Sequence, residues 1–412
     1  MSTVNSAGTG AFAAFSVPNY RRFVLGQSVS VVGSWTETVA QALLILQLTH
    51  SGIILGLATA ARYLPVLLLT PYAGLVVDRH NKRHVLLFTQ TSLAALSLIL
   101  GVLIATGTVQ VWSVFAIALG FGCLTALDNP ARQAFIPEIV GQSLIRNAIT
   151  LNSTFVNVGR AVGPLVAAVL VSTIGLAWCF FVNAASFGAV LIALFSMNLL
   201  LLHPTNRQQH RKGQLLEGFR YALTVPEILA PVLMMAFIGT FTYEFEVSLP
   251  LFARTSLSGS PTTYSWLIGA FGVGSVLGGI YAAKHPKTGV PRLIRIAALY
   301  TVAMIAAALA PDVWVAVPIM AAVGVASILF LTTGNSTIQI AAKPEYRGRV
   351  TALWSTAFLG STPIGATIIG FIGDQDPRAA LMVGAAACLF AAALGAMLLR
   401  QRQHARSAVV DA

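Results

Sequence analysis

Five charged residues lie inside long apolar runs of the sequence, where a lipid bilayer would exclude them. They are Glu37, Arg62, Arg160, Glu244 and Glu246. A charge near the centre of a bilayer costs at least about 2.5–3.5 kcal/mol, so an ionisable residue in such a run is a functional candidate by default. A carboxyl group beside an arginine or a cationic ligand can exchange its proton near neutral pH. These five positions are therefore the predicted binding sites for protons and for a solute.

Helix geometry sets expectations and alternatives for these residues. At 1.5 Å per residue, Glu37 lies about 22 Å along its run, near the middle of a bilayer. Positions 244 and 246 are about 200° apart around a helix, so only one of them should face a cavity. The alternative for Glu37 and Arg62 is an ion pair that only holds two helices together. For Arg160, which follows one glycine and precedes another, the alternative is the bracing of close helix packing.

A second group of charges gathers in residues 74–83, GLVVDRHNKR, although only 9% of the chain is charged. It contains one acid, Asp78, and three bases. A helix N-terminus carries about half a positive charge. We expect Asp78 to dock on the N-terminus of the helix that begins near Arg349, as a latch on one of two conformations. The alternative is a topology signal, which explains the bases but not the acid.

Transmembrane helices must hold these residues in place. The chain has 412 residues, of which 56% are hydrophobic, and a mean hydropathy of +0.79. A soluble domain is about 45–50% apolar and about 25% charged. The three cysteines, Cys123, Cys179 and Cys388, each lie in an apolar run and are expected to be small buried side chains. Because no histidine pairs with a cysteine at ligand spacing, we expect no metal. No cofactor-binding loop appears, so we expect no other cofactor.

Twelve runs are long and apolar enough to cross a bilayer, which takes about 20 residues. They lie at about 23–48, 52–77, 84–105, 110–128, 148–174, 176–202, 226–251, 262–284, 292–310, 312–333, 350–373 and 378–399. An even number places both termini on one side. That side also holds 21 of the 25 lysines and arginines, so it is predicted to be cytoplasmic. Because these bases are scattered over seven loops and tails, we expect no nucleic-acid binding despite the net charge of +12.

The predicted fold is all-α, with twelve transmembrane helices in two pseudo-symmetric bundles of six. The predicted parts are a polar tail (1–18), a first bundle (19–202), a cytoplasmic linker (203–225), a second bundle (226–399) and a basic tail (400–412). Two matched halves are typical of transporters whose binding site lies between the repeats, near the middle of the bilayer. In such a repeat, Glu37 corresponds to the pair Glu244 and Glu246, which would place carboxylates on opposite walls of one cavity.

Three stretches carry a resemblance to a known family. GLVVDRHNKR resembles the signature loop of the major facilitator superfamily, Gly-x-x-x-Asp-Arg-x-x-Arg/Lys-Arg, with Asn81 where the family often has glycine. We expect Asn81 to be tolerated because asparagine also adopts a left-handed backbone. VGRAVGP (158–164) is similar to the Gly-x-x-x-Gly-Pro element of the antiporter members. DNPARQAFIPEIVG (128–141), with the segment that leads into VGRAVGP, resembles the drug:proton antiporter branch that includes the enterobactin exporter and macrolide efflux proteins.

The resemblance implies residue roles and a function. The implied cytoplasmic gate consists of Gly74, Asp78, Arg79, Arg83 and Asp128, and Arg79 and Arg83 are expected to reach Asp128. The implied helix-5 antiporter motif consists of Gly159, Gly163 and Pro164. We expect a monomer in the bacterial cytoplasmic membrane that exports a small, partly apolar organic molecule in exchange for protons, with lipid as its surroundings.

Two alternatives to a proton-driven exporter follow from the same sequence. The first is an importer or facilitator on the same fold, and the second is a membrane sensor or scaffold that no longer transports. A direct ATP-driven pump is disfavoured because no lysine follows a glycine, as an ATP-binding loop requires. The glycines of GAFGVGSVLGG (269–279) do not fit a dinucleotide loop and are expected to allow close helix packing. An enzyme is not expected, because the sequence shows no nucleophile–base set.

Overall fold

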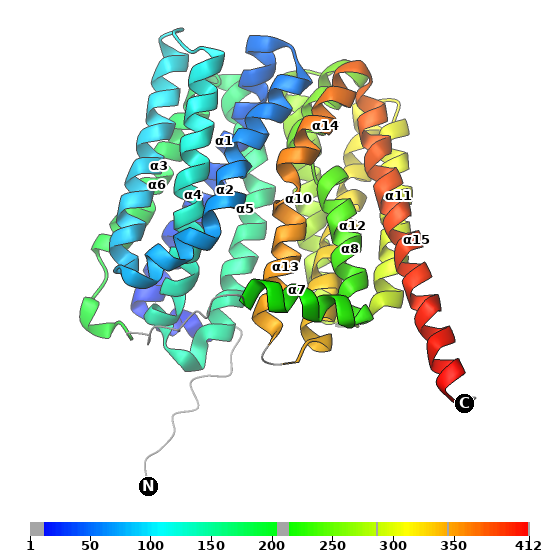
Figure 1. Cartoon of the computed structure of the whole chain (residues 1–412). Coiled ribbons are helices and arrows are strands. Elements are labelled where there is room, and N and C mark those ends of the chain that lie inside the picture. Colours follow the sequence, from blue (N-terminus) through cyan, green and yellow to red (C-terminus); the bar gives the residue numbers. More distant parts are fainter. Residues whose placement is uncertain (1–11, 204–213, 286, 344–345, 411–412) are drawn as a thin grey trace. The chain divides into compact units, whose positions relative to one another are not determined.

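The structure, a computed structural model, describes residues 12–203, 214–285, 287–343 and 346–410. Within these residues, twelve helical stretches are long and apolar enough to cross a membrane, as the sequence predicts. The first six are α1 (Pro18–Thr49), α2 (Gly52–Arg79), α3 (Lys82–Ala105), α4 (Val111–Val140), α5 (Ile145–Thr173) and α6 (Ala177–Phe195). A short helix, α7 (Gln214–Thr224), lies in the predicted linker, of which residues 204–213 lie outside the described residues. Figure 1 shows the helices in sequence colours.

The second set of six contains two helices that are broken. The seventh span consists of α8 (Pro226–Phe241) and α9 (Phe245–Leu251), followed by a π-helical turn (Phe252–Ser256). The eleventh consists of α13 (Arg347–Leu359) and α14 (Thr362–Gln375). The unbroken ones are α10 (Pro261–Lys284), α11 (Val290–Leu309), α12 (Val313–Ala341) and α15 (Pro377–Val410).

A proline accounts for the break in the eleventh span. Pro363 has no N–H to donate to the carbonyl of residue 359, and its ring disfavours a helical backbone at the residue before it. The eleventh span accordingly breaks at residues 360–361. In the seventh span, Pro250 lies within α9, beyond the break at residues 242–244, so this proline does not cause the break.

Contacts between the helices divide the chain into two units. Unit 1 consists of Met1–Leu44 and Leu64–Gln208, and unit 2 of Ile45–Tyr63 and Gln209–Ala412. The division differs from the predicted bundles in one segment. Residues 45–63, which form the end of α1 and the start of α2, belong to unit 2 by their contacts, although they precede the linker in sequence.

Glycines allow the helices of unit 2 to touch at their backbones. A methyl group added at Gly274 of α10 would lie 1.9 Å from the carbonyl oxygen of Ala321 in α12, and one at Gly324 would lie 2.0 Å from that of Phe271. These distances are far below van der Waals contact. The glycine-rich run 269–279 therefore serves close packing, as the sequence indicates.

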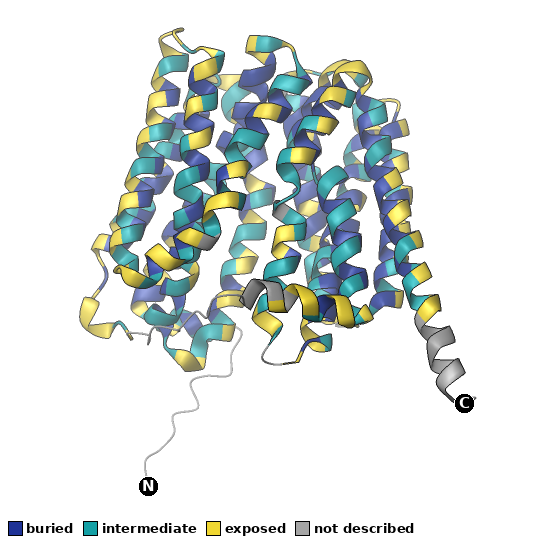
Figure 2. Ribbon diagram, in the orientation of Figure 1, coloured by how far each residue is buried: buried dark blue, intermediate teal, exposed yellow. Residues whose placement is uncertain are grey.

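Large apolar side chains are exposed on many helix faces. Trp314, Leu299 and Ile192 are each more than 60% exposed, and Figure 2 shows yellow, exposed positions recurring along the helices. Soluble monomers rarely expose so much apolar surface. Lipid tails would cover these side chains, so this surface fits a multi-pass membrane protein.

Candidate functional site

Glu37 lies fully buried within unit 1, on α1. Its Oε2 accepts a hydrogen bond from the Ser97 hydroxyl of α3 and another from the Asn183 amide of α6, at 2.5 Å. The Asn183 amide also lies 3.1 Å from the Ser97 oxygen. Neutral donors of this kind can serve the carboxyl group whether it is charged or protonated. The site residues that the sequence analysis missed, Ser97 and Asn183, were signalled only by being polar in apolar runs.

The predicted antiporter motif lies where α5 approaches α1. A methyl group at Gly159 would lie 2.4 Å from Val31, and one at Gly163 would lie 2.4 Å from Trp35. The Arg160 guanidinium lies over the Trp35 ring, 5.0 Å from its centroid, in a cation–π contact. Small residues thus bring the helices together and place the arginine on an aromatic face. The role of Arg160 in transport stays a prediction.

Glu244 is the last residue of the break in the seventh span, directly before α9. It is 3% exposed, and its backbone (φ −80°, ψ 41°) is not helical. The predicted angle of about 200° between positions 244 and 246 assumed an unbroken helix. That assumption is wrong because α8 ends before Glu244 and α9 begins after it. The two carboxylates instead lie close enough for their charges to repel each other.

The two broken helices of unit 2 cross beside Glu244. A methyl group at Gly365 of α14 would lie 1.8 Å from the carbonyl oxygen of Thr240 and 3.0 Å from the Glu244 carboxyl. Thr362, the first residue of α14, is a hydrogen-bond partner of that carboxyl. Among the described residues, Glu244 Oε1 is buried without a hydrogen-bond partner. A buried carboxyl group with spare hydrogen-bonding capacity is thus placed next to the N-terminus of a 14-residue helix.

Glu246 has a different environment, although it is only two residues further along the chain. Its Oε1 accepts a hydrogen bond from the Tyr63 hydroxyl of α2, at 3.1 Å, and the residue is half-buried. Arg62 lies close enough to Tyr63 to affect it electrostatically, and Tyr264 of α10 lies close to both Tyr63 and Glu246. The structure therefore brings Arg62 and both acids of the seventh span into one polar cluster of unit 2.

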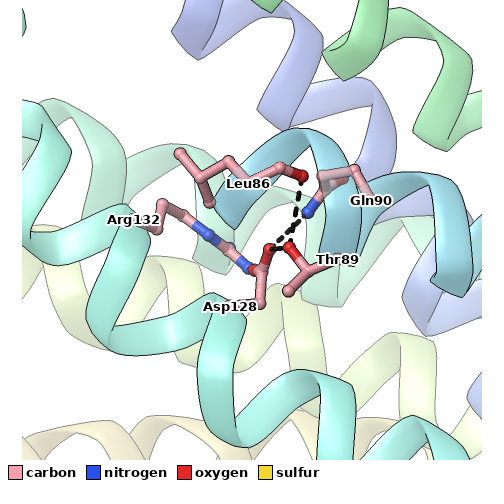
Figure 3. A network of polar contacts seen from close by, with 5 residues as sticks. All are labelled: Leu86, Thr89, Gln90, Asp128 and Arg132. Carbon is pink, nitrogen blue, oxygen red and sulfur yellow. Dashed lines mark hydrogen bonds and ion pairs between the residues drawn. The ribbon is translucent and has the colours of Figure 1, made fainter. Parts of the chain in front are cut away.

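Asp128 is the centre of a second buried network, shown in Figure 3. Its Oδ1 accepts hydrogen bonds from the Thr89 hydroxyl at 2.7 Å and from the Gln90 amide at 2.8 Å, and its Oδ2 pairs with Arg132 one turn along α4. The sequence analysis expected Arg79 and Arg83 to reach this acid. The structure places Arg132 there, because a residue four positions away on one helix faces the same side.

Arg83 is used elsewhere in unit 1. Its Nε donates to the carbonyl oxygen of Leu194, and its guanidinium lies 5.9 Å from the centre of the Phe195 ring. Arg79 is exposed at the end of α2, and Asp78 is half-buried in the last turn of that helix. A methyl group at Gly74 would meet open space. The latch predicted for these residues stays a prediction.

Asn81 in the signature loop caps a helix and does not adopt the expected left-handed backbone. Its backbone is extended (φ −68°, ψ 117°), and its side chain accepts hydrogen bonds from the N–H groups of Arg83 and His84. It is therefore the N-cap of α3, a position that asparagine favours. The expected left-handed backbone was wrong, because the capping geometry needs no positive φ.

We expect Asp128 to matter for stability. Replacing Asp128 with alanine leaves Arg132, Thr89 and Gln90 without their shared acceptor. Removing one member of a buried ion pair costs about 3–5 kcal/mol, and the lower figure applies here because Arg132 is about a quarter exposed. Thermal unfolding in detergent, followed by the labelling of buried cysteines, should shift down by several degrees. Asp128→Asn keeps an acceptor oxygen, so its unfolding temperature should fall by less. An unchanged unfolding temperature for Asp128→Ala would contradict this role.

Solved structures with the same arrangement of helices are transporters. The crystal structure of a bacterial homolog to the human lysosomal transporter Spinster, in an inward-facing and unoccupied conformation, matches with a TM-score of 0.75 and 17% identity over 93% of this chain and 96% of that one. The nucleoside transporter NupG matches with a TM-score of 0.67 and 12% identity over 92% and 99%. The fold of the chain is therefore that of these transporters.

Sequence comparison gives the family within that class. The profile of the family described as "Transmembrane secretion effector" matches residues 9–410, and the chain belongs to this family. The enterobactin exporter EntS of Escherichia coli (strain K12) is 23% identical over 396 residues, which make up 94% of this chain and 94% of the relative. An uncharacterized MFS-type transporter, YfiS of Bacillus subtilis (strain 168), is 24% identical over 257 residues, or 61% of this chain and 60% of the relative.

Proposed function

We propose that this protein exports a small, partly apolar organic molecule across a bacterial cytoplasmic membrane in exchange for protons. Both termini are cytoplasmic in this proposal, and the protein works by alternating access. The observation that carries it is a buried carboxyl group in each unit, Glu37 in unit 1 and Glu244 in unit 2. Each lies in a span predicted to cross the bilayer.

The surroundings of the two carboxyl groups support proton binding. Glu37 accepts hydrogen bonds from the neutral side chains of Ser97 and Asn183, which can serve the carboxyl group in either protonation state. Glu244 has a threonine hydroxyl and a second carboxylate as neighbours. Glu244 Oε1, buried without a hydrogen-bond partner among the described residues, has the capacity to take up a proton.

The relatives support export and suggest the kind of cargo. The family is described by secretion, and a relative that covers 94% of the chain is named as an exporter of enterobactin. Enterobactin is therefore one candidate for the cargo of this protein. Trp35 with Arg160 offers an aromatic ring and a positive charge that could contact a partly apolar molecule.

A pH gradient should drive transport. Purified protein in proteoliposomes is given an imposed pH gradient, and the movement of iron-free enterobactin and of the cationic dye ethidium is followed. We expect accumulation of at least one probe on the side that supplies protons, abolished by a protonophore. A sodium gradient at equal pH on both sides is the matched control. Transport that requires ATP, or that does not depend on the pH gradient, would contradict the proposal.

A further inference from the structure

A carboxylate of the eleventh span caps the N-terminus of α2. Asp374, in the last turn of α14, accepts hydrogen bonds from the backbone N–H groups of Gly52 and Ile53, the latter at 3.0 Å. It also accepts one from the Ser51 hydroxyl at 2.9 Å. All three donors belong to the start of α2, where unpaired N–H groups and the helix dipole favour a negative charge. The predicted topology places this end of α2 on the outer face of the membrane.

Glycines bring the two helices close enough for this contact. A methyl group at Gly52 would lie 2.7 Å from the carbonyl oxygen of Gly370, and one at Gly56 would lie 2.3 Å from that of Ala366. The same methyl group at Gly52 would lie 2.6 Å from Leu251 of α9. Leu251 is 5% exposed. The start of α2 therefore packs against α14 at backbone distance and covers an apolar residue of the seventh span.

An arginine holds the neighbouring helix end. Arg254, in the π-helical turn that follows α9, donates to the carbonyl oxygen of Leu46 at 3.1 Å. Leu46 lies in the last turn of α1, and its carbonyl oxygen also accepts a hydrogen bond from the N–H of His50. The helix dipole favours a positive charge at this end. The turn between α1 and α2 thus has an arginine at the helix C-terminus and an aspartate at the helix N-terminus. The sign of each charge matches the helix end that it contacts.

We infer that Asp374 and Arg254 form an outer clamp, which closes the outward end of the transport path by holding residues 45–63 on unit 2. The inference rests on the proposed function, because only a protein that opens outward needs to release such a clamp. It also gives a physical reason for the assignment of residues 45–63 to unit 2. When the clamp opens, Leu251 loses its cover.

The outer clamp is the counterpart of the latch predicted at the other end of α2. Asp78 lies in the last turn of α2 and is expected to dock on the N-terminus of α13, the first half of the eleventh span. Asp374 lies in the last turn of the eleventh span and docks on the N-terminus of α2. Each of the two antiparallel spans thus supplies a carboxylate for the start of the other. Alternating access requires that the two contacts form in alternation.

The reactivity of a cysteine at position 251 tests the clamp without any substrate. Leu251→Cys is introduced into full-length protein whose native cysteines are replaced by serine or alanine, and a membrane-impermeant thiol reagent is added from the outer side. Asp374→Asn and Arg254→Gln should each raise the labelling rate about fivefold, the upper range for an exposed contact at a helix end. Asp376→Asn is the matched control, since that acid caps the N–H of Arg378 instead. Equal labelling in Asp374→Asn and Asp376→Asn would overturn the inference.

A crosslink provides a second test that does not depend on removing a charge. The Ser51 and Asp374 side chains touch, so the pair Ser51→Cys and Asp374→Cys should form a disulfide under oxidation. The oxidised protein should lose transport of the probes that the wild type moves, and reduction should restore it. Full transport by the crosslinked protein would show that this end need not open. A wild type that ignores the pH gradient would instead contradict the proposed function and leave the labelling result standing.

Discussion

Replacing Glu244 with glutamine is expected to abolish accumulation of the probe against its gradient. Glutamine keeps the size of the side chain and its bond to Thr362 but cannot carry the proton. Because Glu244 is buried at the crossing of the two broken helices, water cannot easily take over its role. Downhill movement of the probe should persist. Proteoliposomes assayed with and without a pH gradient separate the two activities.

Glu246→Gln and Glu37→Gln extend this test. Glu246 accepts a hydrogen bond from Tyr63, which a glutamine carbonyl can also accept, so Glu246→Gln should retain most of the coupling. Glu37→Gln should resemble Glu244→Gln, because its carboxyl group is also buried within a candidate membrane span. If all three variants insert normally and still concentrate the probe, the carboxylates are structural.

Asp78→Asn is expected to abolish most transport while the protein stays inserted and correctly oriented. The three bases of the loop remain to set the topology. A carboxylate at a helix N-terminus contributes about 0.3–1 kcal/mol when exposed and up to about 2 when partly buried. Asp78 is half-buried, so its loss should shift the balance of two conformations about tenfold, which corresponds to about 1.4 kcal/mol. The protein should then rest open to the cytoplasm.

Labelling of cysteines from the outer face shows in which direction Asp78→Asn shifts the two conformations. In Asp78→Asn, cysteines near Ser51 and Gly259 should become less accessible from outside, and so should Leu251→Cys. Asp374→Asn should change the labelling in the opposite direction, and the double variant Asp78→Asn/Asp374→Asn should return toward the wild type. Unchanged labelling on both faces in Asp78→Asn would mean that the acid is no latch, and the loop would be a topology signal.

The sequence predicted the helices well and their interruptions poorly. Apolar length decides whether a segment can span a bilayer, and this property is local, so twelve spans were found. The break before Pro363 also has a local signal, the run Gly-Ser-Thr-Pro. This signal was missed because the hydropathy of the whole segment indicates one continuous helix. The break at residues 242–244 depends on tertiary contacts, such as the bond from the Thr242 hydroxyl to the carbonyl of Gly384. No spacing within the seventh span reveals that partner.

The sequence predicted which charged residues belong to the candidate site, but not which residues they contact. Charges in apolar runs identify Glu37 and Glu244 because the bilayer penalises them. Ser97 and Asn183 are neutral, so they carry no comparable penalty and no comparable signal. The role of Asp374 was missed because an acid at the end of an apolar run is typical of the start of a loop. Its partners at the start of α2 are specified only by the fold.

The outer clamp also bears on the order in which the chain is assembled. Asp374 is 323 residues from Ser51 and 322 from Gly52. Chains fold from the N-terminus as they are synthesised, so α2 enters the membrane long before α14 exists. Its first N–H groups must meanwhile be satisfied by water or lipid headgroups, which a helix end at the membrane surface can reach and a helix centre cannot. Because the clamp lies at the membrane surface, the first N–H groups of α2 can stay hydrogen-bonded until α14 has been synthesised.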